Sequence, residues 1–264
     1  MSRVVAIALN TFREAIRNKV LYSLLFFAVA LIASALALGQ MSLHEEARVT
    51  RDLGLGGMAL FGVLIAIFVG VNLVYKELDR KTVFSLIPKP IHRYEFVLGK
   101  FGGMVLTLAV QIAIMTAVLG GVLAMQGASL AEAEPVGRAI VLLFGEVVVI
   151  TSVAVLFSTF TTPFLSGVFT LGMFLVGRST PELRELIGKL PSAPLRMALG
   201  GALRVVPDLH VFYVSGSMID GRYVTVHGDY VDWSYVATAS GYGILYAACA
   251  LSLGILIFSR RDFV

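Results

Sequence analysis

KELDRKTVFSLIPKPIHRYEFVLGK, residues 76–100, is the stretch that decides how the rest of the chain can fold. It carries nine charged side chains, whereas the runs on either side of it, 53–75 and 101–125, carry none. A hydrocarbon core of about 30 Å needs about 20 apolar residues to cross it as a helix. The two flanking runs are therefore expected to span a membrane, and the charged stretch is expected to join them outside it.

The composition of the whole chain indicates the same class. Of its 264 residues 58% are hydrophobic and 14% are charged, and the mean hydropathy is +0.87. These values are typical of a polytopic membrane protein. We expect an all-α fold in which residues 1–264 form a single transmembrane domain with six spans. The expected spans are 20–39, 53–75, 101–125, 139–160, 161–177 and 234–259, of which the fifth is short, carries Pro163 and stops at Arg178.

The distribution of Lys and Arg predicts the orientation, because basic residues in short loops resist translocation. The two chain ends and the loop 76–100 together hold twelve basic residues, whereas the short loops at the other ends of the spans hold three. Both termini and this loop are therefore expected to be cytoplasmic, and an even number of spans agrees.

Two further segments have a pattern of their own. Residues 1–19 repeat apolar side chains at spacings of three and four, which predicts an amphipathic helix in the headgroup plane; the alternative is a longer first span. Residues 178–233 contain helical stretches at 181–190 and 195–206 and then many aromatic residues. We expect an extracytoplasmic cap at the membrane surface, where an outside partner could bind, in preference to a disordered loop.

The charged loop has two halves. Residues 77–87 contain no Gly or Pro and can form a short amphipathic helix, which Pro88 and Pro90 end. A short helix of this kind on a cytoplasmic loop is a docking element.

The motifs in this loop resemble those of the ABC-2 type permeases, in which a Glu precedes Gly-Thr, a Leu-rich turn, Pro-x-x-Arg and Gly-Lys. Lys81 stands where that family has Gly. Two later motifs are similar to those of permeases from nitrous-oxide-reductase maturation clusters. The matching residues are Glu77, Thr82, Leu86, Pro90, Arg93, Gly99 and Lys100 in the loop, Pro207-Asp208-Leu209 with Phe212, and Phe258–Phe263 at the C terminus.

The resemblance implies the membrane subunit of an ABC transporter in a bacterial cytoplasmic membrane. Two such subunits, forming a homodimer, would work with two cytoplasmic ATPase subunits that bind ATP and Mg²⁺. The residues expected to couple to the ATPase are Glu77, Asp79, Arg80, Lys81, Thr82, Pro90 and Arg93. The alternative for each charge is contact with lipid headgroups, which we favour for Lys76 and Lys100 at the helix ends.

The sequence contains no phosphate-binding motif of an ATPase. Neither Gly99-Lys100 nor Gly188-Lys189 sits in a phosphate-binding Gly-x4-Gly-Lys-Ser/Thr motif. The four histidines are expected in loops, which argues against membrane proteases that need intramembrane histidines, and no catalytic, metal or nucleic-acid site is expected. The rival functions are an ion-driven carrier and a non-transporting scaffold.

Three polar residues within the expected spans are weak candidates for a substrate path. Burying the Glu146 carboxylate at the bilayer centre costs about 2.5 to 3.5 kcal/mol, so it should face protein or water. It could equally be a packing contact to a neighbouring helix, and for Asn72 and Gln111 interhelical hydrogen bonding is the favoured alternative. The Gly99-x3-Gly103 pair predicts close helix packing, more often within one subunit than between two.

Overall fold

The computed structural model describes residues 3–40, 46–79, 92–127, 133–213, 217–219, 222–224 and 232–260. In these ranges the chain forms nine α-helices, a 3-10 helix η2 and a two-stranded antiparallel hairpin. The helical fold is confirmed, and the small hairpin was not indicated by the hydropathy pattern. The elements are α1 (Arg3–Ala15), α2 (Lys19–Gln40), α3 (Glu46–Asp79), α5 (Arg93–Met125), α6 (Ala133–Ser158), α7 (Pro163–Arg178), α8 (Thr180–Gly188), α9 (Ala193–Val205), η2 (Leu209–Phe212), β1 (Ser217–Ile219), β2 (Arg222–Val224) and α10 (Trp233–Arg260).

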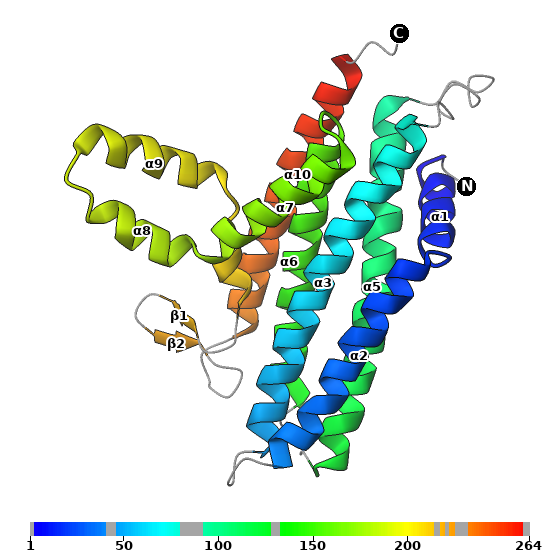
Figure 1. Cartoon of the computed structure of the whole chain (residues 1–264), viewed down its shortest axis with the longest axis vertical. Helices are drawn as coiled ribbons and strands as arrows, with labels where there is room; N and C mark the ends of the chain where they lie inside the picture. The colour runs from blue at the N-terminus through cyan, green and yellow to red at the C-terminus, as the bar shows by residue number, and fades with distance from the viewer. Residues whose placement is uncertain are drawn as a thin grey trace.

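Five of the described helices, α2, α3, α5, α6 and α10, are long and apolar enough to cross a membrane. They lie side by side along the long axis of the molecule (Figure 1). Both chain ends lie at one end of this bundle, where α3 also ends and α5 begins (Figure 1). That grouping matches the prediction that the termini and the charged loop share one side.

Helix α7 is the exception among the expected spans. With 16 residues it is about 24 Å long, which is less than the hydrocarbon thickness. Pro163 stands at its first turn, and it ends at Arg178, close to the middle of α6. The structure thus has five long spans and one short apolar helix, and a complete sixth helical span is not found in the described residues.

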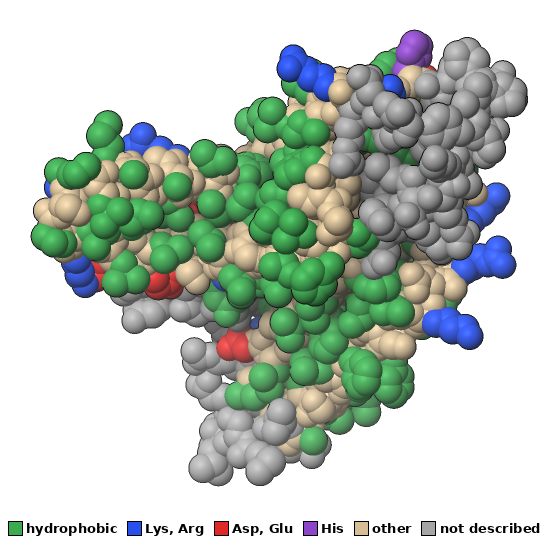
Figure 2. All heavy atoms as spheres, turned by 45° about the horizontal axis from the view of Figure 1, so that its top comes forward, with side chains coloured by type: hydrophobic (Ala, Val, Ile, Leu, Met, Phe, Trp, Pro, Cys, Tyr) green, Lys and Arg blue, Asp and Glu red, His purple; other side chains and the backbone are tan. Residues whose placement is uncertain are grey.

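Helices α8 and α9 form a hairpin that follows α7. The hairpin projects from the side of the bundle, level with the middle of α10 and not beyond the ends of the spans (Figure 1). This position differs from the expected surface cap because α7 stops halfway along α6. Helix α9 buries none of its residues, and apolar side chains cover much of the hairpin (Figure 2).

The centre of the bundle is made by α3 and α6. In their spanning windows 67% and 61% of the residues are buried, against 22% in α2 and 33% in α10. Met58 and Ile65 of α3 and Leu142 and Ile150 of α6 are fully buried. The outer helices therefore leave most of their apolar surface to lipid, as expected for a membrane protein.

Helix α1 packs against the start of α5. A Cβ placed on Gly99 would lie 2.7 Å from Cβ of Ile7, and one placed on Gly103 would lie 2.5 Å from the Ala8 carbonyl oxygen. Only residues without a side chain allow this approach, so the prediction that these glycines pack helices of one subunit is confirmed. The oxygen Oδ1 of Asn18 accepts a bond from the Val20 amide at the start of α2, so α1 and α2 are separate helices.

Replacing Gly103 by Ala should loosen α1 from α5. The added methyl group would meet the backbone of Ala8 and Cβ of Thr11 at 2.6 Å, and we expect the free energy of unfolding to fall by about 1–3 kcal/mol. Gly120→Ala is the matched control, because a Cβ there meets nothing within 4 Å. Thermal denaturation of the two variants in detergent measures the difference, and equal stability would contradict this packing.

Candidate functional site

The charged loop begins as a continuation of the second long span. The apolar run of that span ends at Tyr75, but α3 continues without a break to Asp79. Glu77 and Asp79 thus belong to the same helix as the buried residues of the bundle. Of the other residues expected to couple to an ATPase, Arg80, Lys81, Thr82 and Pro90 lie outside the described part of the chain.

The loop ends where α5 begins, and this end is bonded to the last helix. Arg93 Nη1 donates hydrogen bonds to the carbonyl oxygens of Phe258 at 2.9 Å and Ser259 at 2.7 Å. The last carbonyls of a helix have no partner within it and favour a cation. The rings of Phe96 and Phe258 stack with centroids 6.1 Å apart. The start of α5 and the end of α10 are therefore held together by charge and by packing.

Lys100 fastens the same end of α5 to α1. Its side chain is 2% exposed, Nζ lies 3.8 Å from Glu14 Oε2, and it lies 5.9 Å from the centre of the Phe96 ring. The expectation that Lys100 contacts lipid headgroups is wrong. The reason is that Gly99 and Gly103 let α1 cover this position, and a buried ammonium group then needs a nearby carboxylate.

A second polar cluster lies halfway along the bundle. Glu146 of α6 is 1% exposed, and its Oε1 accepts a hydrogen bond of 2.6 Å from Nη1 of Arg178, the last residue of α7. The guanidinium lies 3.9 Å from the centre of the Tyr213 ring. Of the alternatives for Glu146, the contact to a neighbouring helix is present, and a role in a substrate path stays a prediction.

The other two candidates for a substrate path are Gln111 and Asn72. Gln111 is 4% exposed on α5, and within the described residues its Oε1 has no hydrogen-bond partner. Asn72 lies on α3, within the apolar run 53–75.

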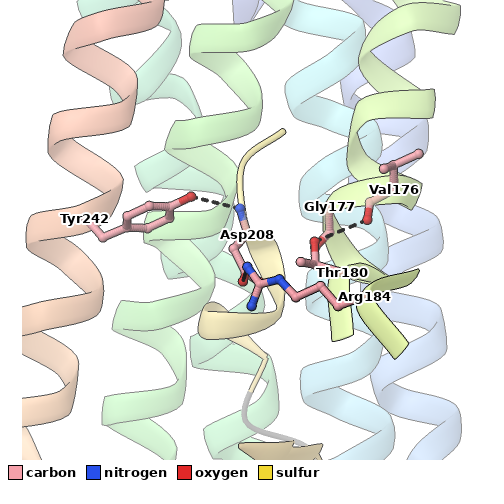
Figure 3. Close-up of polar contacts among 6 residues, drawn as sticks. All are labelled: Val176, Gly177, Thr180, Arg184, Asp208 and Tyr242. Carbon is pink, nitrogen blue, oxygen red and sulfur yellow. Dashed lines mark hydrogen bonds and ion pairs between the residues drawn. The ribbon is translucent and has the colours of Figure 1, made fainter. Parts of the chain in front are cut away.

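The chain returns from the α8–α9 hairpin along α10 through residues 206–213, which include the short helix η2 and which we call the returning segment. Tyr246 donates its hydroxyl proton to the Val205 carbonyl at 2.9 Å, and Tyr235 donates to the Val211 carbonyl at 2.6 Å. Between them the Asp208 amide donates to the Tyr242 hydroxyl at 2.8 Å (Figure 3). We call these three side chains the tyrosine row. Their spacing of seven and four residues places them on one face of α10.

Three glycines make room for this returning segment. A Cβ on Gly145 or on Gly243 would lie 2.9 or 3.0 Å from the ring of Phe212, which therefore fits between α6 and α10. A Cβ on Gly177 would lie 2.5 Å from the Pro207 carbonyl oxygen.

The end of α7 is capped locally. The hydroxyl of Thr180 donates to the Gly177 carbonyl at 2.9 Å (Figure 3). Arg184 of α8 forms an ion pair of 2.9 Å with Asp208 (Figure 3). The hairpin is thereby joined to both α7 and the returning segment.

Comparison with known proteins identifies the protein family. A family model for ABC-2 family transporter proteins matches residues 5–178, about two thirds of the chain. The chain belongs to the ABC-2 transporter family. This ABC-2 permease is thus a multi-pass membrane component of an ABC transporter. Members of this family are membrane subunits that lack an ATPase domain, so family membership implies an ABC ATPase as partner. No curated protein matches the sequence.

The matched range contains most of the geometry described above. It runs from α1 through α7 and includes both ends of the charged loop, the Lys100–Glu14 contact and the Glu146–Arg178 pair. Sequence reasoning missed the Lys100–Glu14 contact, although a Lys directly after the first glycine of Gly99-x3-Gly103 was a signal. It also missed the tyrosine row, whose helical spacing was visible in the last span.

The contact between Glu14 and Lys100 in this permease can be tested by removing each partner in turn and comparing the two losses of stability. Glu14→Ala should lower the free energy of unfolding by about 1–2 kcal/mol, because the ammonium group stays buried while the partly exposed carboxylate is lost. Lys100→Met should be close to neutral, because a similar apolar chain fills the same space.

Glu185→Ala is the control, since its pair with Lys189 is 70% exposed on both sides and should contribute less than about 0.5 kcal/mol. Denaturation in detergent measures all three variants. A Lys100→Met variant that is less stable than Glu14→Ala would contradict this account.

Proposed function

We propose that this permease binds a cytoplasmic ABC ATPase through the loop 76–100 and uses ATP hydrolysis to move a substrate outward or to transmit force across the membrane. The complex contains two permease copies and two ATPase copies, and ATP and Mg²⁺ bind to the ATPase. Both termini are cytoplasmic, and the membrane is the bacterial cytoplasmic membrane. The two-to-two assembly and the sidedness follow from the family resemblance and from the Lys and Arg distribution.

The observation that carries this proposal is the way the loop is anchored. On one side α3 continues as a helix to Asp79, and on the other side Arg93 is bonded to the last carbonyls of α10. A movement that the docking segment passes to either of these ends is therefore passed on to the spans. Movement of whole packed helices about an interface is a common way for proteins to pass on a conformational change.

Helix α10 favours force transmission as a form of this function. Its last turn is bonded to Arg93 beside the loop, and its tyrosine row is bonded to the returning segment near the other end. A single helix of 28 residues therefore connects the loop with the segment that leads to the extracytoplasmic side. The same segment contains Pro207-Asp208-Leu209 and Phe212, which support similarity to the permeases of nitrous-oxide-reductase maturation clusters.

The test is co-purification of the permease with its ABC ATPase, followed by measurement of ATP hydrolysis. Glu77→Ala should weaken assembly, and Arg93→Ala should assemble but lower ATP turnover in the complex about tenfold, because the loop no longer moves α10. Lys189→Ala, directly after α8, is the control and should change neither quantity. Unchanged assembly and turnover in both loop variants would exclude this function for the loop.

A further inference from the structure

Helix α9 combines an apolar surface with two arginines. It buries none of its residues, and Leu195, Met197 and Val205 are 47%, 83% and 70% exposed. Its only charged residues are Arg196 and Arg204, and both are exposed. On the helix the two arginines lie within about 80° of each other, whereas Leu195 lies about 100° or more from both. Such a helix is typical of the boundary between lipid headgroups and acyl chains.

The charges of the hairpin indicate where the bilayer ends on this side of the molecule. Helix α7 contains no charged residue before Arg178, whereas the hairpin 180–205 carries six. A charged side chain that faces hydrocarbon is costly, so we expect α7 within the acyl chains and the hairpin at the headgroups. Figure 2, in which the end with the chain termini is tilted forward, shows mainly apolar side chains on this side of the hairpin and acidic ones along its lower edge.

The length of α7 then brings lipid headgroups close to the hairpin. Its 16 residues are about 24 Å long, against about 30 Å for a typical hydrocarbon core. Helix α10, with 28 residues, is about 42 Å long and extends beyond such a core. A bilayer adapts to a short apolar helix by becoming thinner beside it. Phosphate groups are therefore drawn to the level of α9.

A hollow runs along α7 beside the base of the hairpin. It is open and apolar, has a volume of about 530 Å³, and is lined by Phe157 of α6, by residues 168–176 of α7 and by Val206. The α7 residues extend over about 12 Å along the helix axis. The rings of Phe157 and Phe169 lie 5.6 Å apart, so α6 and α7 are in contact beside the hollow. An elongated apolar hollow at this depth fits an acyl chain that runs along α7.

The end of the hollow at Val206 lies next to Arg204 in the sequence. Within the described residues Arg204 forms no ion pair. The acidic residue closest to it in the sequence, Asp208, is already paired with Arg184 at 2.9 Å. A guanidinium group matches the geometry of a phosphate and binds it with two hydrogen bonds.

We propose that the hollow and Arg204 form a binding site for an anionic phospholipid of the leaflet that faces away from the chain termini. One acyl chain lies in the hollow along α7, and the phosphate accepts hydrogen bonds from the Arg204 guanidinium. Arg196 lies about 12 Å farther along α9 and contacts other headgroups. The bound lipid holds the hairpin at its depth in the bilayer. The site does not depend on an ATPase, so the permease alone can test it.

Photolabelling of the permease in phosphatidylcholine nanodiscs tests the site. A small fraction of phosphatidylglycerol with a photoreactive acyl chain is the probe, and mass spectrometry locates the label. The measured quantity is the label near Met173 in the hollow divided by the label near Phe26 and Phe27, which are exposed on α2. We expect this ratio to be about fivefold higher than with phosphatidylcholine that carries the same acyl chain, because one basic residue changes anionic-lipid binding by about this factor. Equal ratios for the two lipids would overturn the site.

Two arginine variants test the headgroup contact. Arg204→Gln should lower the phosphatidylglycerol ratio about fivefold, and Arg196→Gln, on the same exposed helix, should leave it unchanged. Because α9 buries none of its residues, neither change disturbs the packing. Equal losses in both variants would show a general attraction to basic residues and would overturn the assignment to Arg204.

Two glycine variants test the acyl-chain contact. A Cβ on Gly172, which lines the hollow, meets nothing within 4 Å, so Gly172→Leu should fill the hollow and lower the ratio for both probe lipids. Gly120→Leu on α5 is the matched control, because a Cβ there also meets nothing within 4 Å. Unchanged labelling in Gly172→Leu would overturn the hollow as the acyl-chain site. If that variant fails to fold, the comparison of the two lipids on the wild-type permease decides.

Discussion

The structure depends on one constraint, which is that backbone amides and carbonyls inside a bilayer must find their partners within the protein. The five long helices satisfy this internally. The segment after α9 runs beside α10 at the level of the spans, and only its short 3-10 helix η2 makes regular backbone bonds. The tyrosine row supplies partners for the last carbonyl of α9 at Val205, for the Asp208 amide and for the Val211 carbonyl of η2. Gly145 and Gly243 admit Phe212, so that the same segment is packed as well as bonded.

A second consequence of the same setting is that helices approach one another through small residues. In lipid the hydrophobic effect does not drive apolar helix faces together. Helix association therefore depends on close backbone contact and a few polar bonds. At the start of α5, Gly99 and Gly103 bring α1 so near that Lys100 is enclosed and lies beside Glu14. Halfway along the bundle, α7 buries only small residues and ends in the Glu146–Arg178 pair. In both places small residues allow close helix packing, and an ion pair adds a polar contact beside it.

The sequence predicted what depends on hydropathy and local pattern. The five long spans, a separate first helix and the close packing at Gly99 and Gly103 all follow from runs and spacings within one segment. Contacts between distant segments did not follow. Arg178 was recognised as the end of a short span and Glu146 as a mid-span charge, but their pairing depends on where α7 stops along α6. Lys100 was misplaced for the same reason, since its burial depends on α1 and not on its position at a helix end.

The two attachments of the α8–α9 hairpin bear on how such a permease can move. Helix α10 is bonded to Arg93 at one end and to the returning segment near the other, so α5, α10 and that segment form one connected unit. Helix α7 also packs against the returning segment, because a Cβ on Gly177 would lie 2.5 Å from the Pro207 carbonyl oxygen and 3.0 Å from the buried Leu209 side chain. The Arg178 guanidinium lies 3.9 Å from the ring of Tyr213 in the same segment. A displacement of the charged loop that reaches the returning segment through α10 therefore reaches the end of α7 as well.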